Sequence, residues 1–461
     1  MEFFFNPKGV AVIGATENRL KGGFHLLRNV IESYKGKVYP VNPRYASLMD
    51  MPCYPDVASI PDDFDIAVYF IPAPGLYRAI EECASKNVKG IIIESAGFAE
   101  VGVEGRNLQE ECVLLAHKHG IRLWGPNCMG LLDSRLGHVF SFMYMDDWKT
   151  LLKPGNVSMI VQSGMLSAGF LLMVLERGGM AISKMCSIGN KCDVNETELL
   201  EFLVNDPATD AIGLYAESIT EPRRFLSIAS GTDKPIVLVK GGRSPGGARA
   251  AMSHTASMAG NYRILQSAMK QAGVIEATDF NEMMDILKGF SKTRSFSSFD
   301  TAGTAVVTFS GGGGIVTSDM LYESGLSLAE LSEETLTELK TVFPPWMDPA
   351  NPVDIWPAIE YSGVETVFSK VSEAVMNDPG VNSVIIHIFA FGVQGTFFNN
   401  LAKLKNDLGK PVVVWLAGLG QNMKECRTVL EDLGIPVFDE MSRTVSVLSA
   451  LKSHFQRQER P

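Results

Sequence analysis

The feature that most constrains this chain is a regular alternation between short apolar runs and amphipathic segments. Five apolar runs lie in the N-terminal part, namely GVAVIGA (9–15), KVYPVN (37–42), DIAVYFI (65–71), GIIIES (90–95) and IRLWG (121–125). Helical patterns lie between most of them, near 22–34, 75–86 and 104–119. Continuous β-branched runs that alternate with helices are typical of a parallel, doubly wound sheet. Ligands of such sheets bind beyond the carboxyl ends of the strands.

Two further units repeat this alternation. The second runs from about 155 to 295, with strands predicted at NVSMIV, ISKMCSI, AIGLYAE, PIVLVKG and GVIEA. The polar stretch SKTRSFSSFDTAG (291–303) is typical of a linker, and strands are predicted after it at AVVTFS, NSVIIHIF, PVVVWLAG and IPVFD. A chain of 461 residues is long enough for several domains. We expect three α/β domains, at 1–130, 150–292 and 300–461.

Charge and cysteine content exclude several classes of protein. The net charge of −11 argues against a nucleic-acid partner, although backbone amides can still hold a small anion. The seven cysteines are odd in number and show no CxxC spacing, which predicts reduced thiols, a cytoplasmic location and no metal site. The uncharged run 154–175 contains Gln162-Ser163-Gly164, so we interpret it as strand, turn and helix, not as a membrane span. The N-terminus lacks the basic region of a signal peptide.

The first strand-to-helix turn, GVAVIGATENRLKGG, has the glycines that a phosphate site needs. Gly14 follows the strand and Gly22-Gly23 open the next helix, which lets the backbone approach an anion. The turn is not GxGxxG, so a plain tight turn is the alternative. The second strand ends in VNPRY, where Arg44 suits a phosphorylated ribose better than a free 2′-hydroxyl. NADP and coenzyme A are both candidates, and a merely solvated arginine is the third interpretation.

The second and third units open in the same way. Ser163-Gly164 follows a strand, with Glu176 thirteen residues after Ser163, and Ser310-Gly311 follows another, with Glu323 thirteen residues after Ser310. Each opening exposes backbone N–H groups at a helix start. Either alone could be a close-packing turn, but the matched spacing makes a shared anion site more plausible.

One segment, GGRSPGGARAAMSHTASMAG (241–260), is too poor in large apolar side chains to form a core. We expect a mobile loop there, carrying His254. A lone loop histidine is usually a surface residue. Glu217, at the end of AIGLYAE, could orient a histidine, although a strand-end acid is by itself more often merely solvated. Candidates for a substrate pocket, which could equally be core residues, are Phe140, Phe142, Met143 and Trp356.

Taken together, these segments resemble a known family. In chain order they are GVAVIGA, KVYPVNP, GIIIESAGF, GPNCMG, VQSGML, GLYAES, GGRSPGGARAAMSHTASMAG, GGGGIV and NPVDI. Over nearly the whole chain this order is similar to the alpha subunit of NDP-forming acyl-CoA synthetases, relatives of succinyl-CoA ligase. The resemblance implies a CoA-binding Rossmann-like domain followed by two flavodoxin-like, doubly wound ligase domains. It also implies an acid–thiol ligase that converts acyl-CoA, NDP and phosphate into carboxylate, CoA and NTP.

The same resemblance implies roles for individual residues. His254 would be phosphorylated during the cycle, and Glu217 would assist it. The residues that would open the two phosphate-binding helices are Ser163, Gly164, Gly313 and Gly314. The residues that fall where relatives contact CoA are Gly14, Ala15, Thr16, Arg44, Pro72 and Ser95, with Asn127 near the thioester.

The resemblance also implies a partner subunit, because this chain holds no further unit for a nucleotide-binding domain. All three units are accounted for, so an ATP-grasp beta subunit that binds ADP or ATP with Mg²⁺ is expected as a separate partner. The substrate is expected to be a small carboxylic acid or its acyl-CoA, with no membrane partner.

The sequence departs from the usual pattern of the family at three places. VQSGM replaces the usual SQSGA, GGGG replaces AGGPG, and Ala256 replaces a glycine. These departures keep open a catalytically silent CoA-binding regulatory or scaffold protein. An NADP-dependent oxidoreductase would leave the His254 segment unexplained.

Overall fold

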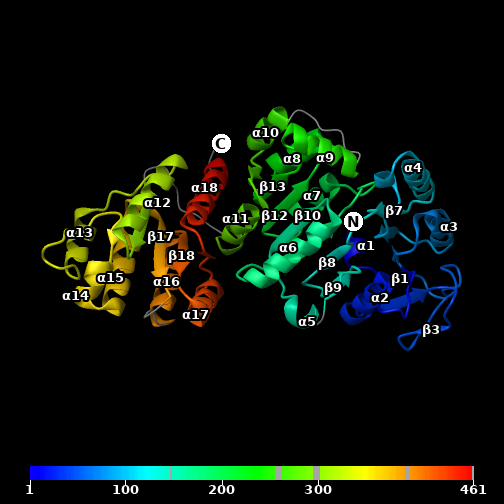
Figure 1. The fold of residues 1–461 in the computed structure, drawn as a ribbon, viewed down its shortest axis with the longest axis horizontal. Coiled ribbons are helices and arrows are strands. Elements are labelled where there is room, and N and C mark those ends of the chain that lie inside the picture. Colours follow the sequence, from blue (N-terminus) through cyan, green and yellow to red (C-terminus); the bar gives the residue numbers. More distant parts are fainter. Residues whose placement is uncertain (146–147, 256–261, 294–301, 391–394, 459–461) are drawn as a thin grey trace. The chain divides into compact units, whose positions relative to one another are not determined.

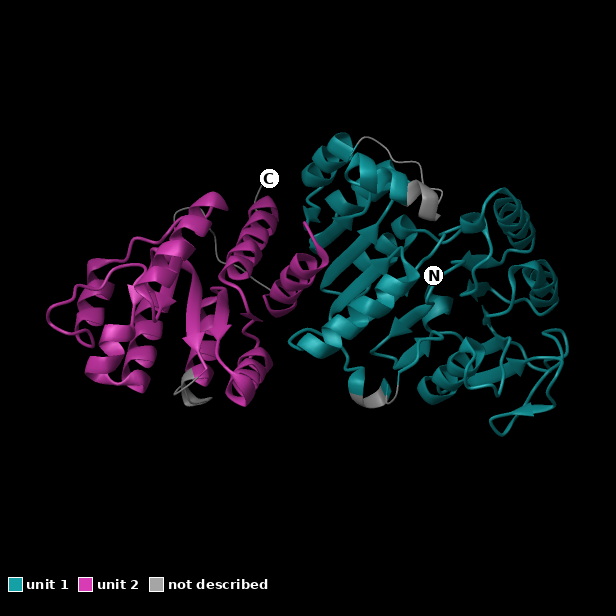
Figure 2. Ribbon diagram, viewed as in Figure 1, with its two compact units in different colours: residues 1–277 teal, residues 278–461 magenta. Residues whose placement is uncertain are grey.

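The structure is a computed structural model that describes residues 1–145, 148–255, 262–293, 302–390 and 395–458 (Figure 1). The side chains of residues 149–150, 251–255 and 395–397 lie outside this description. The chain divides into two compact units, Met1–Ala277 and Thr278–Pro461, coloured separately in Figure 2. Each unit is an α/β structure built on parallel sheets, so the expected fold class is confirmed.

The first unit begins with a five-stranded, fully parallel sheet in the order β2-β1-β5-β6-β7. Its strands are β1 (Gly9–Ile13), β2 (Lys37–Val41), β5 (Ile66–Tyr69), β6 (Gly90–Ile93) and β7 (Arg122–Trp124). Helices α2 (Gly22–Ser33), α3 (Leu76–Ser85) and α4 (Val103–Lys118) connect them. Because β1 lies between β2 and β5, the strand order reverses at its carboxyl end, where a ligand crevice is expected.

Successive side chains of β1 pack into two different apolar clusters, one on each face of the sheet. Val10 and Val12 belong to the same apolar cluster as Leu26 of α2. Ala11 and Ile13 belong to a different cluster, because successive strand residues point to opposite faces. Burial on both faces is why the strand is apolar throughout.

The second sheet of this unit has seven strands in the order β14-β13-β12-β10-β11-β8-β9. Its parallel strands are β10 (Val157–Val161), β11 (Ile182–Ser187), β12 (Ala211–Ala216), β13 (Ile236–Lys240) and β14 (Ile275–Glu276). Its helices are α6 (Gly164–Arg177), α7 (Glu196–Val204), α8 (Pro222–Ser230), α9 (Pro245–Thr255) and α10 (Tyr262–Gln271). The uncharged run 154–175 is therefore a strand, a turn and a helix, and no helix in the described ranges is both long and apolar enough to cross a membrane.

An antiparallel hairpin completes the edge of the second sheet. It consists of β8 (Leu131–Asp133) and β9 (His138–Phe140), and β8 pairs with β11. Lys184 of β11, which is buried, forms ion pairs with Asp133 (3.3 Å) and Asp206 (2.8 Å). The indole N–H of Trp124 in β7 donates to the Ser187 carbonyl of β11 (2.6 Å). The first unit is thus one body in which two sheets share a boundary.

Short elements complete the first unit. The apolar N-terminal residues form α1 (Glu2–Phe5), whose Phe4 and Phe5 rings contact Trp124 edge-on. The remaining short elements are β3 (Ser47–Leu48), β4 (Met51–Pro52), η1 (Ala73–Gly75), η2 (Ala99–Val101) and α5 (Trp148–Leu151).

The second unit contains a five-stranded parallel sheet in the order β16-β15-β17-β18-β19. Its strands are β15 (Gly303–Thr308), β16 (Val353–Asp354), β17 (Val381–Phe389), β18 (Val412–Ala417) and β19 (Val437–Phe438). Its helices are α11 (Phe280–Lys292), α12 (Gly311–Glu323), α13 (Glu333–Lys340), α14 (Trp356–Ser362), α15 (Val364–Asn377), α16 (Gly395–Leu408), α17 (Gly420–Asp432) and α18 (Met441–Gln458). Helix α11 packs on α18, where a Cβ at Gly289 would come within 2.4 Å of Val447.

Candidate active site

Two adjoining cavities lie at the carboxyl ends of the strands in the first unit. The larger, of about 990 Å³, is lined by residues of the turns after β1, β2 and β5, including Gly14, Thr16, Lys21, Gly22, Gly23, Asn42, Arg44, Tyr45, Pro72 and Arg78. The smaller, of about 580 Å³, is lined by residues including Glu94, Ser95, Asn127, Cys128, Met129, Phe142, Ser163, Gly164, Asn190 and Glu217. Phe70, Ile71 and Pro72 line both, so the two cavities are neighbours on either side of this segment. We name them the crevice and the inner cavity.

The glycines of the first turn bring backbone close to the crevice. Gly14 has φ +96°, and a Cβ there would lie 2.6 Å from the carbonyl oxygen of Phe70. A Cβ at Gly23 would lie 2.2 Å from the Gly14 carbonyl oxygen. Larger residues would therefore push the turn away from α2. The turn is fixed in a form that exposes the start of α2 to the crevice.

The turns after β1 and β2 are tied together by polar side chains. The Asn42 amide donates to the Ala15 carbonyl (2.8 Å), while its Oδ1 accepts from the Arg44 backbone N–H (3.0 Å). The Thr16 and Tyr45 hydroxyls lie 3.1 Å apart. Ala15 is fully buried and does not line the crevice, whereas Arg44 is exposed and does. These contacts fix the backbone of the turn after β2, so that Arg44 and the start of α2 line the same crevice.

Asn127 is held firmly at the middle of the inner cavity. Its backbone N–H donates to the Ser95 carbonyl (2.9 Å), and its φ of +56° is one that asparagine tolerates. The Asn127 side-chain amide donates to Asn190 Oδ1 (3.4 Å), and Asn190 in turn donates to Glu100 (2.6 Å). The segments that follow β6 and β7 thus lie against each other. Asn127 can offer an amide donor to a ligand there.

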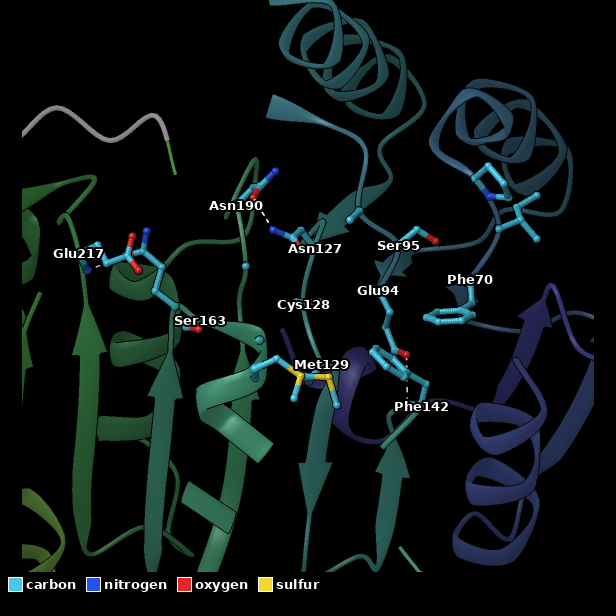
Figure 3. Close-up of a pocket in the computed structure, with 17 residues that line it drawn as sticks. Phe70, Glu94, Ser95, Asn127, Cys128, Met129, Phe142, Ser163, Asn190 and Glu217 are labelled. Carbon is cyan, nitrogen blue, oxygen red and sulfur yellow. Dashed lines mark hydrogen bonds between the residues drawn. The ribbon is translucent and has the colours of Figure 1, made fainter. Parts of the chain in front are cut away.

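The start of α6 and the end of β12 meet at one side of the inner cavity (Figure 3). Ser163 precedes α6, and its side chain forms no capping hydrogen bond within the described part of the chain. The Gln162 amide oxygen accepts from the backbone N–H groups of Glu217 (2.7 Å) and Ser218 (3.3 Å), which joins the two strand ends. The Tyr215 hydroxyl donates to the Glu217 carboxylate (3.3 Å). This region therefore combines a helix N-terminus with a carboxylate.

The segment around His254 differs from the expected loop. Residues Pro245–Thr255 form helix α9, in which the Gly247 N–H is capped by the Ser244 hydroxyl (3.0 Å). Alanine has the highest helix propensity, so an Ala-rich tract favours a helix once a cap is available. His254 lies in this helix, but its side chain lies outside the described residues. Ala256 also lies outside them.

The second predicted helix opening lies in the other compact unit. Ser310 precedes α12, and its hydroxyl accepts from the Gly313 N–H (3.3 Å). A Cβ at Gly314 would come within 2.8 Å of Pro352. Beneath this turn the buried His387 contacts the Thr308 hydroxyl (2.9 Å), and burial lowers the pKa of His387 to about 4. The histidine supports the turn in its neutral form.

One prominent residue of the inner cavity was not anticipated from the sequence. Glu94, only 4% exposed, lines the cavity beside Phe70 and Phe142, whose ring centroids are 4.7 Å apart. Burial raises the pKa of Glu94 well above its usual range. The sequence signal for it is an acid at the end of a fully apolar strand, GIIIES.

The four candidate pocket residues have different positions. Phe142 lines the inner cavity, whereas Phe140 is fully buried in the core. Met143 lines a separate small cavity beside Trp148, and Trp356 belongs to the second unit. Within the described residues, no group of three or more His, Cys, Asp or Glu side chains could hold a metal ion.

Comparison with known families agrees with this architecture. Residues 8–133 match a CoA binding domain, residues 154–290 a succinyl-CoA ligase like flavodoxin domain, and residues 304–459 a ligase-CoA domain. The fold and the crevice therefore define a protein of the CoA-binding ligase class, related to succinyl-CoA ligase.

Individual relatives narrow this class. The chain is 34% identical to acetate–CoA ligase [ADP-forming] II subunit alpha of Pyrococcus furiosus, over 98% of this chain and 97% of that one. It is 36% identical to acetate–CoA ligase [ADP-forming] II of Archaeoglobus fulgidus, over 98% of this chain and 67% of that longer protein. A solved structure of dinucleotide forming acetyl-coenzyme A synthetase 1 from Ca. Korarchaeum cryptofilum, in complex with phosphate and ADP, superposes with a TM-score of 0.89. It is 32% identical and is matched over 99% of this chain and 97% of that one.

The chain belongs to the family of NDP-forming acyl-CoA synthetases, as the resemblance predicted. Within that family it corresponds to the alpha subunit, which it matches nearly end to end.

Proposed function

We propose that this chain, together with a nucleotide-binding partner, catalyses the reversible conversion of acyl-CoA, NDP and phosphate into carboxylate, CoA and NTP. One observation carries the proposal. A crevice with basic side chains adjoins an inner cavity that is lined by Glu217 and by the start of α6. A CoA ester and a phosphate ion can therefore meet in one place.

The crevice is suited to the nucleotide part of CoA. Lys21 and Arg44 line it and offer positive charge to the phosphates, whereas Arg78 is paired with Glu82 (2.7 Å). The start of α2 adds its backbone N–H groups. We place the 3′-phosphate at Arg44 and the pantetheine arm along Pro72, which lines both crevice and inner cavity. The thioester then lies between Ser95 and Asn127. Gly14, Ala15 and Thr16 form the turn that approaches the phosphates.

The first chemical step requires a bound phosphate ion beside the thioester. We place the ion at the start of α6, where Ser163 and Gly164 present N–H groups and the helix dipole favours an anion. The second helix opening, at Gly313 and Gly314 in the other unit, is proposed to bind phosphate as well. A phosphate oxygen attacks the thioester carbonyl carbon, the C–S bond breaks, and CoA leaves as its thiolate. Asn127 donates to the carbonyl oxygen as negative charge develops there.

The second step transfers the phosphoryl group to the protein. A neutral ring nitrogen of His254 attacks the phosphorus of the acyl phosphate, and the P–O bond to the acyl group breaks to release the carboxylate. Glu217 accepts the N–H of the other ring nitrogen, which fixes the tautomer and stabilises the charged phosphohistidine. The phosphohistidine then gives its phosphoryl group to NDP.

The nucleotide is proposed to bind to a separate ATP-grasp beta subunit, which would hold ADP or ATP with Mg²⁺. The close correspondence in length with a relative named as subunit alpha supports this arrangement. A cytoplasmic location is proposed as well. It is supported by the seven cysteines, all of which are free thiols.

Reconstitution tests the proposed function. The chain, co-purified with the partner subunit, is incubated with acyl-CoA, ADP and ³²P-labelled phosphate, and label is followed in ATP and in acid-labile phosphohistidine. We expect both to be labelled. CoA binding without turnover or label would instead identify the silent CoA-binding alternative, and binding of NADP but not CoA would contradict the proposal altogether.

Arg44 provides a test of how CoA is oriented. Arg44→Ala should weaken binding of CoA about tenfold and of 3′-dephospho-CoA less than twofold, since one charge-assisted contact to phosphate is worth about 1.5 kcal/mol. Titration calorimetry with both ligands measures the difference. Arg106→Ala, on the exposed face of α4, removes the same charge outside the crevice and should change neither affinity. Equal losses for both ligands would contradict the placement of the 3′-phosphate at Arg44.

A further inference from the structure

The Phe142 end of the inner cavity is apolar apart from one carboxyl group, that of Glu94. Its apolar side chains there are Phe70, Cys128, Met129 and Phe142. Among the described residues that line it, none is lysine, arginine or histidine. The cavity has about 580 Å³, which the acyl group shares with the thioester and the phosphate ion. An apolar pocket with a few placed polar groups is typical of a specific small-molecule site.

The Glu94 carboxyl is bonded through only one of its two oxygens. Oε2 accepts from the backbone N–H of Phe142 (3.1 Å), whereas buried Oε1 has no hydrogen-bond partner among the described residues. The neighbouring Cys128 thiol does not serve it, because that thiol donates to the Ile93 carbonyl (3.3 Å). Gly130 makes space for Oε1, since a Cβ at that position would lie 2.3 Å from it. The chain thus accommodates this oxygen without bonding it.

The proton of the carboxyl can be placed on one oxygen. Burial raises the pKa of Glu94 well above its usual range, which favours the neutral acid. In the neutral acid the hydroxyl is Oε1, since Oε2 accepts from an N–H group. A buried hydroxyl donor without a partner destabilises a protein, and such groups are rare unless a ligand serves them.

The arrangement of the cavity gives the acyl group a direction. In Figure 3, Ser163 and Glu217 lie at one end of the cavity, and Phe70, Glu94 and Phe142 lie at the other, with Asn127 between them. If the thioester lies at Asn127 and the phosphate at α6, the acyl group extends away from the phosphate, toward Glu94.

We propose that Glu94 is a specificity-determining residue, whose Oε1–H group hydrogen-bonds an oxygen carried by the acyl group. The acyl site then takes monocarboxylic acyl groups that are apolar except for one hydroxyl or carbonyl oxygen. This proposal rests on the proposed function and names its substrate class. An acetyl group would leave Glu94 without a partner, and the second carboxylate of a dicarboxylic acyl group would find no cation in the cavity.

Matched acyl-CoA pairs test the proposal. The complex with the partner subunit is assayed with butyryl-CoA against its 2-, 3- and 4-hydroxy derivatives, and with phenylacetyl-CoA against 4-hydroxyphenylacetyl-CoA. At least one oxygen-bearing ester should exceed its matched ester in kcat/KM by about tenfold or more, because a site built to bond an oxygen rejects the analogue that lacks it. Glu94→Leu should reduce this ratio to within twofold of one, while the affinity for free CoA stays unchanged.

Two further variants separate hydrogen bonding from packing. Glu94→Gln keeps a donor beside Gly130 and should retain most of the preference. Ser141→Ala alters the segment before Phe142 without touching the carboxyl and should leave the preference intact. If Glu94→Leu loses affinity for free CoA, Glu94→Met, which is unbranched like glutamate, takes its place.

The outcomes distinguish the two proposals. Turnover without preference in any wild-type pair, or a preference that survives Glu94→Leu, overturns the role of Glu94 and leaves the proposed function standing. No turnover with any ester, in a complex that binds CoA, overturns the proposed function and this inference with it.

Discussion

Replacement of His254 with alanine is expected to abolish NTP formation, with a loss of about 10⁴-fold or more, while CoA affinity changes less than twofold. The reason is that the phosphoryl group has no acceptor on the protein once the imidazole is removed. The first step does not need the imidazole, so incubation with acyl-CoA and phosphate should still release CoA and form acyl phosphate. A thiol assay and a hydroxylamine trap measure these two products separately from ATP.

The control for this variant is His119→Ala, which removes an exposed imidazole at the end of α4 in the same unit. It should retain full activity. NTP formation by the His254 variant within tenfold of wild type would show that phosphoryl transfer bypasses this residue, and the family mechanism would not apply to this chain.

The second large effect is expected for Glu217→Gln, with kcat falling by about 10²–10⁴-fold and CoA affinity unchanged. Glutamine occupies the same space, yet it is neutral and its NH₂ group donates where the carboxylate accepts. It would therefore favour the wrong histidine tautomer and would not stabilise positive charge on phosphohistidine. Rapid-quench measurement of phosphohistidine formation isolates the affected step.

Glu221→Gln is the matched control, because it makes the same change four residues further along. Glu221 pairs with exposed Arg224 and does not line the inner cavity, so its loss should cost little. If both variants lose activity equally, Glu217 acts on the local fold of the β12–α8 connection and not on the histidine.

Much of the fold could be predicted because its signals are local. The strand β1 is apolar at every position and is buried on both faces, which sequence pattern alone can indicate. Gly14 and Arg44 were predictable for a similar reason, because each follows a strand whose end defines the crevice. The repeated Ser-Gly openings were visible as the starts of α6 and α12.

The remaining features depend on contacts between segments that are distant in the sequence. The hairpin β8–β9 is short, and its place is fixed by pairing with β11 some fifty residues later, which no local pattern encodes. The Ala-rich tract before His254 was expected to be a loop because it lacks apolar side chains, yet a cap and high propensity suffice for a helix. The surroundings of the buried Glu94 carboxyl come from Phe142, which donates to one oxygen, and from Gly130, which leaves space for the other. Both residues lie in a later part of the chain.

The hairpin β8–β9 also bears on how this protein can be cut into pieces for expression. A fragment that ends near residue 130 loses Phe140, whose ring packs against Tyr34. A complementary fragment that begins near residue 150 leaves β11 as a bare edge, and an unpaired strand edge invites intermolecular pairing and aggregation. Excision of the CoA-binding part at its apparent sequence boundary would thus damage both products, so the segment up to Ala277 is the smallest sensible unit for isolated study.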